Sequence, residues 1–268
     1  MACYHLSAQI ISRGKGDSVT AAAAYISGEK LRDSYDGRVY DRSYRKDVMF
    51  KEILLPPNAP TEFLDRQNLM DALNISEKRR DSQLARTIKL ALPNELSFDR
   101  QLALAKEFIM EKFIKAGLCA DVAIHRGELD KSRKPSGIEP VYERQDNPHA
   151  HIIVPFRAVE NDGFNKNKTQ NRYMNSVKYL KELRKEWADL QNREFERMGL
   201  DVRVSHESLA AQGIAREPTM HIGAATMALE LQGIRTGRGD EYRGVIERNK
   251  KRNREHQCSR EHTWERER

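Results

Sequence analysis

Residues 147–157 read NPHAHIIVPFR, and in this segment His149 and His151 begin a run of apolar residues. Side chains at positions i and i+2 of a strand point to the same face, with Cα atoms roughly 6.5–7 Å apart. Two imidazoles at that separation can bind one ion. The segment therefore predicts a strand over HAHIIVPFRAV (149–159) that supplies two metal ligands from one face.

A third histidine, His125, lies near the end of another predicted strand, DVAIHR (121–126). The stretch from 127 to 147 contains Pro, Gly and many charges with little pattern, which predicts a surface loop or insertion. Such an excursion lets the two strands pair as an antiparallel hairpin, with His125 beside His149 and His151. Three nitrogen ligands leave coordination positions open, as a catalytic metal site requires.

The competing interpretation is that these histidines only pack or lie exposed, since one H-x-H among eight histidines is a common accident. His5 is expected to pack on the first strand or to support a ligand. The other four histidines are expected at the surface, namely His206, His221, His256 and His262. Of these, His206 and His221 would at most contact a bound ligand.

Around these segments, strands alternate with helices. Period-two patterns predict strands over 4–11, 47–56 and 82–93. Capping residues and apolar stripes predict helices over 20–33, 61–80, 97–117 and 177–198, the first capped by Asp17 or Ser18. The order is not a strict βαβ alternation, so the chain is predicted to be an α/β fold with a mainly antiparallel central sheet and helices on its faces.

Beyond residue 205 the pattern weakens to turns and a small helix, MALELQGI (227–234). Residues 240–268 are highly charged with hardly any apolar side chains, which predicts a solvated helix or a disordered extension. The expected organisation is therefore a functional domain over 1–239 followed by a charged C-terminal tail over 240–268.

Composition narrows the class of protein. The chain has 268 residues, 38% of them hydrophobic, and a net charge of +7, which fits a phosphate-rich partner without requiring one. We expect no membrane span and no secretion signal, because long apolar runs are missing. Cys3, Cys119 and Cys258 lie far apart, which disfavours disulfides and cysteine-ligated zinc, so a cytoplasmic location is expected.

Tyr25 is the candidate nucleophile among nine tyrosines. It follows TAAAA on a predicted helix, so no large neighbour precedes its phenol; the alternative is a buried aromatic that anchors the helix. A phenol has a pKa near 10 and needs help to attack at neutral pH, which a nearby divalent ion supplies. If the target is a phosphodiester, the phosphotyrosyl ester keeps the energy of the broken bond, so the reaction can be reversed without ATP.

An early-helix tyrosine, an H-x-H strand and an upstream histidine together resemble the MobA/MobL family of plasmid-mobilisation relaxases. Similar segments follow one another in family order over about residues 1–240. These segments are 1–29 with its S-x-x-A-x-x-AY pattern, SQLARTIKLALPNEL (82–96), ALAKEFIMEKF (103–113), AIHRGE (123–128), NPHAHIIVPFR (147–157) and 186–223.

The resemblance implies a histidine-hydrophobic-histidine (HUH) relaxase fold. It implies that Tyr25 bonds to the 5′ phosphate at a nick in an origin of transfer, leaving a free 3′ hydroxyl. It assigns His125, His149 and His151 to a divalent metal, Mn²⁺ or Mg²⁺, with Zn²⁺, Ni²⁺ and Co²⁺ as alternatives.

The resemblance also implies partners and a place of action. The expected partners are single-stranded and hairpin DNA at the origin of transfer, accessory mobilisation proteins and a type IV secretion coupling protein. The protein is expected in the bacterial cytoplasm and is expected to be delivered with DNA to a recipient cell.

Two departures from the family pattern stand out. Relatives often carry an acidic residue where this chain has Arg86 and Thr87, and Thr87 cannot supply a charge to orient a ligand histidine. Asp121 and Glu128 are the candidate replacements. The second departure is the longer insertion between His125 and His149, which either contacts DNA or is merely tolerated.

Basic residues near the site are candidates for DNA backbone contacts, although each one taken singly is better explained as a solvated charge. These are Arg13, Lys15, Lys30, Arg32, Arg126, Lys166, Lys168 and Arg172. Candidates for stacking on bases, or for ordinary core aromatics, are Tyr4, Tyr35, Tyr40 and Phe164.

Three alternatives to a conjugative relaxase remain open from the sequence. A rolling-circle replication initiator or transposase uses the same chemistry at another DNA site. A non-catalytic DNA-binding module uses the histidines structurally. A general metal-dependent phosphodiesterase attacks with water rather than with Tyr25 and forms no covalent adduct.

Overall fold

The computed structural model describes residues 4–126, 147–168, 173–220 and 222–266. The predicted insertion at 127–147 therefore lies almost entirely outside the described residues. The chain forms two compact units, and the described part of the first ends at His206. The boundary at 206/207 lies upstream of the 239/240 boundary predicted from the charge pattern.

A five-stranded sheet forms the centre of the first unit, and its strand order is β1-β5-β7-β6-β4. Every neighbouring pair in it is antiparallel, which confirms the predicted sheet. Its strands are β1 (Leu6–Ser12), β4 (Val48–Leu54), β5 (Gln83–Ala91), β6 (Ala120–His125) and β7 (His149–Pro155).

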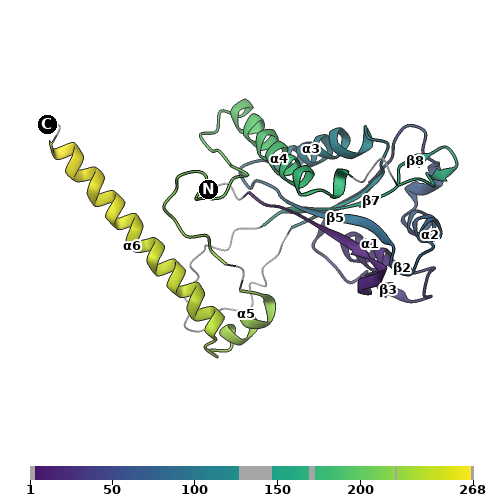
Figure 1. The fold of residues 1–268 in the computed structure, drawn as a ribbon, viewed down its shortest axis with the longest axis horizontal. Coiled ribbons are helices and arrows are strands. Elements are labelled where there is room, and N and C mark those ends of the chain that lie inside the picture. The colour runs from purple at the N-terminus through teal and green to yellow at the C-terminus, as the bar shows by residue number, and fades with distance from the viewer. Residues whose placement is uncertain (1–3, 127–146, 169–172, 221, 267–268) are drawn as a thin grey trace. The chain divides into compact units, whose positions relative to one another are not determined.

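Helices cover both faces of this sheet (Figure 1). Four α-helices belong to the first unit: α1 (Val19–Ser27), α2 (Arg66–Ser76), α3 (Phe98–Ile109) and α4 (Val177–Arg197). Short helical segments at Arg13–Lys15, Thr61–Leu64 and Tyr173–Asn175 precede α1, α2 and α4, and a π-helical segment at Met110–Ile114 continues α3.

The alternation of side chains along each strand divides the core in two. Ile124 and Ile152 share one cluster with Phe108 of α3 and Trp187 of α4, all of them fully buried or nearly so. On the opposite face, Ala123 and Ile153 join the buried residues of α1 and α2. The histidines predicted to bind metal alternate onto this second face, the one that α1 covers.

Helix α1 packs close to the sheet because the side chains that face the sheet are small. Ser18 caps its first turn by accepting a hydrogen bond from the Ala21 amide, as one of the two predicted caps. Ala23 and Ala24 are completely buried. Small side chains at these positions shorten the distance between helix and sheet, and this closeness places the last turn of α1 over β6 and β7.

The predicted helix over 20–33 was too long, and its second half is a hairpin. Gly28 ends α1 with a φ of 65°, a left-handed conformation that glycine adopts without strain. The chain then forms β2 (Lys30–Arg32), antiparallel to β3 (Val39–Asp41). A Cβ at Gly28 would lie 3.2 Å from Val48, so the turn also needs the close approach that glycine allows.

Two other predicted elements are divided. The predicted helix over 61–80 is interrupted at Asp65, whose side chain caps α2 by accepting from the Asn68 amide. The predicted strand over 149–159 ends at Pro155, which has no N–H to continue the ladder. A small separate hairpin follows, with β8 (Val159–Glu160) and β9 (Gly163–Phe164).

The second unit contains α5 (Ala224–Leu231) and α6 (Gly237–Arg266). The charged tail is therefore a helix, one of the two predicted states. Its beginning is fixed by ion pairs, since Arg243 binds Glu230 and Arg248 binds Glu217. In the part of the chain that the structure describes, no helix is both long and apolar enough to cross a membrane.

Candidate active site

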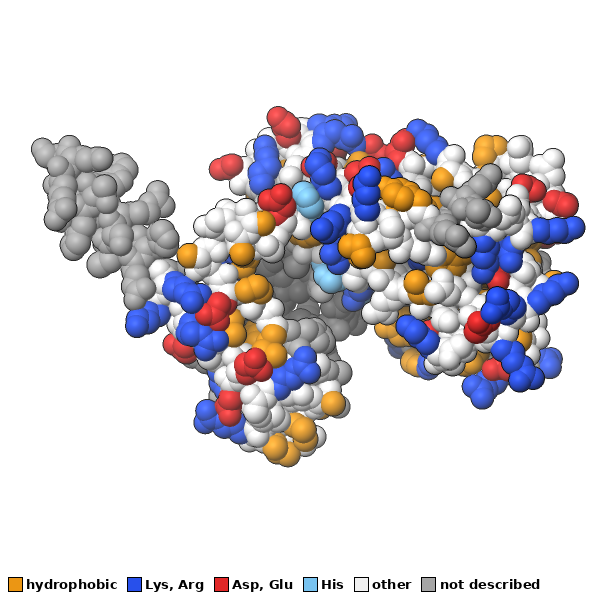
Figure 2. Space-filling view, in the orientation of Figure 1, with side chains coloured by type: hydrophobic (Ala, Val, Ile, Leu, Met, Phe, Trp, Pro, Cys, Tyr) orange, Lys and Arg blue, Asp and Glu red, His pale blue; other side chains and the backbone are white. Residues whose placement is uncertain are grey.

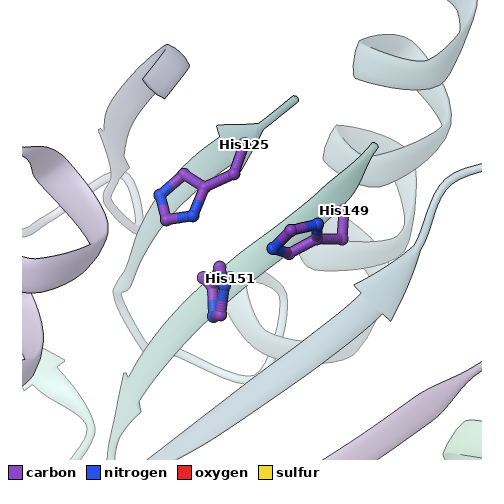
Figure 3. A group of neighbouring side chains, drawn as sticks. All are labelled: His125, His149 and His151. Carbon is purple, nitrogen blue, oxygen red and sulfur yellow. The ribbon is translucent and has the colours of Figure 1, made fainter. Parts of the chain in front are cut away.

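Three imidazoles converge on one face of the sheet (Figure 3). The β6–β7 register pairs His125 with His149 directly, and His151 follows two residues later on the same face. One nitrogen of each ring lies within 4.8 Å of the corresponding nitrogens of the other two. The hairpin predicted from the sequence is therefore present, and it brings the three predicted ligands together.

Hydrogen bonds hold two of the rings in a fixed orientation. His125 donates from Nε2 to the Ile26 carbonyl at 2.7 Å, and His149 donates from Nδ1 to the Asn147 carbonyl at 2.7 Å. Donation by one ring nitrogen leaves the other with its lone pair available, which is the form that binds a metal. The nitrogens that keep a lone pair are then Nε2 of His149 and Nδ1 of His125, and the second of these lies 3.3 Å from Nη2 of Arg45.

His151 completes the set with an unsatisfied atom. Its Nε2 is buried and has no hydrogen-bond partner among the described residues. A buried polar atom without a partner costs free energy unless a ligand satisfies it. Three inward imidazole nitrogens, one of them orphaned, form a donor set that fits a divalent transition metal with open positions.

Burial keeps these rings neutral. Removal from water lowers the pKa of His149 to about 4 and that of His151 to about 3, and it also lowers the pKa of His125. Neutral imidazole is the metal-binding form, so protons compete little with a metal for these ligands at pH 7.

Tyr25 lies beside this cluster in the last turn of α1. Its ring centroid is 6.1 Å from that of His125 and 6.0 Å from that of His151. The residue is 46% exposed, so it is not the buried anchor that the alternative interpretation requires. An exposed phenol next to three inward-facing imidazoles is the arrangement that a tyrosine nucleophile needs.

Arg45 connects Tyr25 to the histidines, and the sequence analysis missed it. Its guanidinium carbon lies 4.1 Å from the Tyr25 ring centroid, and Nη1 donates to the Tyr25 carbonyl at 2.9 Å. The same group pairs with Asp47 and approaches Nδ1 of His125 at 3.3 Å. Nothing in the sequence separates Arg45 from the other basic residues, because its role arises from the packing of α1 near the start of β4.

The carboxylate that acts electrostatically on His125 and His149 is Asp47 rather than Asp121. Asp121 is 1% exposed and receives two hydrogen bonds from Arg66, so the structure uses it in a buried ion pair. Glu128 lies outside the described residues. Arg45 lowers the pKa of Asp47, and the Asp47 charge in turn favours the protonated form of His125.

The predicted DNA-binding residues differ in their surroundings. Arg13 donates to Asn74 and stacks on Tyr35, and Lys168 pairs with Glu77. These two cations therefore have intramolecular roles. The other described candidates are exposed, namely Lys15, Lys30, Arg32, Arg126 and Lys166. Among them Lys30 also pairs with Asp41 at 3.9 Å, and Arg126 has an interaction within the protein. Arg172 lies outside the described residues.

The predicted stacking aromatics are largely engaged within the protein. The Tyr4 hydroxyl donates to the Arg184 carbonyl, and Phe164 stacks on Phe63 with centroids 5.2 Å apart. Tyr35 lies under Arg13, and Tyr40 is half-buried. In the visible face of the molecule, basic side chains are spread among acidic ones rather than gathered in one patch (Figure 2).

Comparison with known proteins agrees with this geometry. The model of the MobA/MobL family matches residues 17–232. The mobilization protein MobL of Acidithiobacillus ferridurans is 32% identical over 265 residues, which cover 92% of this chain and 68% of MobL. The conjugal transfer protein TraA of Rhizobium radiobacter is 29% identical, and the match covers 88% of this chain but 22% of TraA.

A solved structure is also similar. It comes from work on the molecular basis of vancomycin resistance transfer in Staphylococcus aureus, and it superposes with a TM-score of 0.65 at 32% identity. The match covers 77% of this chain and all of that one. The family model spans most of the chain, including the Tyr25 helix and the histidine strands. The chain therefore belongs to the MobA/MobL family.

Proposed function

We propose that residues 1–239 are the DNA-nicking and strand-transfer domain of a mobilisation relaxase, with Tyr25 as nucleophile. The observation that carries this proposal is the contact of the Tyr25 ring with two of the three converging histidines. Its ring centroid lies 6.1 Å from that of His125 and 6.0 Å from that of His151. The mobilisation and conjugal-transfer names of the relatives support the choice of an origin of transfer as the DNA site.

The reaction is a transesterification. The Tyr25 phenol oxygen forms a bond to the phosphorus, the bond to the 3′ oxygen breaks, and the departing oxygen takes a proton to become a 3′ hydroxyl. The phenol proton leaves to solvent before or during attack, and the Arg45 guanidinium lies over the phenol ring, 4.1 Å from its centroid. The product is a 5′-phosphotyrosyl adduct, and attack by a 3′ hydroxyl on it rejoins the strand after transfer.

His125, His149 and His151 would hold the divalent metal, with Mn²⁺ or Mg²⁺ as the proposed ion and Zn²⁺, Ni²⁺ or Co²⁺ as alternatives. When bound, the ion neutralises negative charge that develops on the phosphate oxygens. The protein's own contribution is to keep the three rings neutral and oriented.

The proposed substrate is a single strand, with a neighbouring hairpin, at an origin of transfer. Accessory mobilisation proteins and a type IV secretion coupling protein are the proposed partners. We place the protein in the bacterial cytoplasm before delivery with the DNA to a recipient.

A denaturing adduct gel tests the proposal. The full chain is incubated with Mn²⁺ or Mg²⁺ and single-stranded oligonucleotides that tile the DNA flanking its gene. We expect one oligonucleotide to give a denaturation-resistant adduct that Tyr25→Phe abolishes while DNA binding persists. Tyr44→Phe is the matched control, since Tyr44 is also exposed.

Two results would contradict the proposal. Adduct formation by Tyr25→Phe at the wild-type rate would remove Tyr25 from its role. Cleavage by the wild-type protein without any adduct would indicate attack by water, the chemistry of a general phosphodiesterase.

A further inference from the structure

Lys89 occupies the sheet position next to the histidine cluster. In β5 it pairs directly with His151 on one side and with Ser7 of β1 on the other. Directly paired residues of antiparallel strands point to the same face. The Lys89 side chain therefore belongs to the face that carries the three imidazoles, on β5, whereas α1 packs over β4, β6 and β7.

This lysine has no counter-ion within the part of the chain that the structure describes. Lys89 is half-buried, and among the described residues its amine has no hydrogen-bond or ion-pair partner. Its direct neighbours on this face of the sheet are His151 of β7 and Ser7 of β1, and neither carries a negative charge. A partly buried ammonium without a counter-ion is unfavourable on its own, so the position points to an anionic ligand.

The residues around Lys89 on this face are polar. Ser7 is half-buried and its hydroxyl lies 3.1 Å from Nε2 of His5, which is exposed. Gln9 is also exposed, and Thr87 is half-buried. These hydroxyl, amide and imidazole groups continue the histidine face across β5 to β1, where a strand leaving the histidine cluster would lie.

We propose that Lys89 binds one backbone phosphate of the single-stranded DNA, adjacent to the phosphate that Tyr25 attacks. The proposal rests on the proposed function, because it takes single-stranded DNA as the ligand of this face. Phosphate contacts fix the register of a strand without reading its sequence. Lys89 would thus position the strand across β5 and β1, next to the histidines.

Equilibrium binding without cleavage tests this role. The full chain binds fluorescent dT30 in EDTA, and the dissociation constant is measured by anisotropy over a range of NaCl concentrations. Loss of one phosphate contact should lower the slope of log Kobs against log[salt] by about 0.7. We expect Lys89→Met to show that change with roughly tenfold weaker binding at low salt, and Lys89→Arg to retain most of the wild-type slope.

Lys78→Met is the matched control, since Lys78 is an exposed lysine that precedes the opposite end of β5. It should bind like the wild type. Thermal melting separates a ligand role from a structural one, because removal of an uncompensated charge should leave the melting temperature unchanged or raise it.

An unchanged salt slope in Lys89→Met would overturn the proposal, and so would weaker binding that comes with a lower melting temperature and is not restored by arginine. The adduct gel fails or succeeds separately. If Tyr25→Phe still formed adducts, Tyr25 would not be the nucleophile, and the dT30 binding result for Lys89 would be unaffected.

Discussion

The Tyr25 ring meets the His151 ring edge-on, with centroids 6.0 Å apart and planes at 88°. The two residues come from different elements, the last turn of α1 and the second position of the histidine pair on β7. Their contact therefore depends on the close packing of α1 on the sheet through Ala23 and Ala24. The nucleophile is held beside the histidines before any DNA binds.

Arg45→Met should slow nicking by about 10- to 100-fold while DNA binding changes little. The reason is that Arg45 both covers the Tyr25 ring and holds its backbone carbonyl, and misplacement of a reacting group by about 1 Å costs this much. Single-turnover adduct formation measures the rate. Arg45→Lys should restore little, because an ammonium cannot make the paired contacts of a guanidinium.

The control for Arg45 is Arg38→Met, which removes an exposed arginine paired with Asp36. It should nick at the wild-type rate. Wild-type kinetics in Arg45→Met would instead mean that packing of α1 alone positions Tyr25.

Metal binding should stabilise the protein through the three histidines. At a Mn²⁺ concentration of about 100 times the dissociation constant, linkage predicts about 2.7 kcal/mol, or a rise in melting temperature of roughly 5–10 °C. His151→Ala should lose this rise, because its Nε2 is an inward-facing donor without another partner among the described residues. His206→Ala should keep it, and an equal rise in both variants would place the metal elsewhere.

The metal-free protein should lose stability as the pH falls below about 6.5. The pKa values of His149 and His151 are lowered in the folded state to about 4 and about 3, so the unfolded chain binds more protons between these values and 6.5. Stability then rises with pH across this window and is fully present above it. The loss at pH 5 is up to roughly 2 kcal/mol per histidine.

Denaturant titrations at pH 5 and pH 7 measure this loss. In the variant with both His149 and His151 replaced by Asn, the difference between the two pH values should shrink. A difference as large as in the wild type would assign the pH dependence to other groups.

Local patterns were sufficient to predict the histidine hairpin, since His125, His149 and His151 owe their convergence to strand periodicity and to one antiparallel pairing. The same reasoning predicted the antiparallel sheet and Ser18 as a cap of α1. The prediction of a helix over 20–33 was wrong after Gly28, where good helix formers such as Glu29 and Lys30 continue the helical pattern of the sequence. The left-handed turn at Gly28 and the pairing of β2 with β3 override that local preference.

Arg45, Asp47 and Lys89 could not be selected from the sequence for a different reason. Each acquires its role only when non-adjacent segments meet: Arg45 through α1, and Lys89 through its neighbours on β1 and β7. Among 47 basic residues, no local feature marks these two. The choice of Asp121 as a partner of His125 relied on nearness along the chain, and its contact with Arg66 was not visible there.

The Arg66–Asp121 pair gives the last prediction. Arg66 is 8% exposed and Asp121 is 1% exposed, and Arg66 also binds Glu29. Removing one member leaves a buried charge without its partner, so Arg66→Met should lower the free energy of unfolding by about 3–5 kcal/mol. Arg79→Met, which breaks an exposed pair with Asp81, should cost about 1 kcal/mol or less.

The same pair separates a structural role for Asp121 from a role in the metal site. Replacing both partners by apolar residues, Arg66→Met with Asp121→Leu, should recover much of the stability that Arg66→Met loses, because no unpaired charge remains. If Asp121 serves only the ion pair, this double variant keeps the Mn²⁺-induced rise in melting temperature, since the hydrogen bonds that orient His125 and His149 come from backbone carbonyls. A stable double variant that no longer responds to Mn²⁺ would show instead that the Asp121 carboxylate supports the histidines directly.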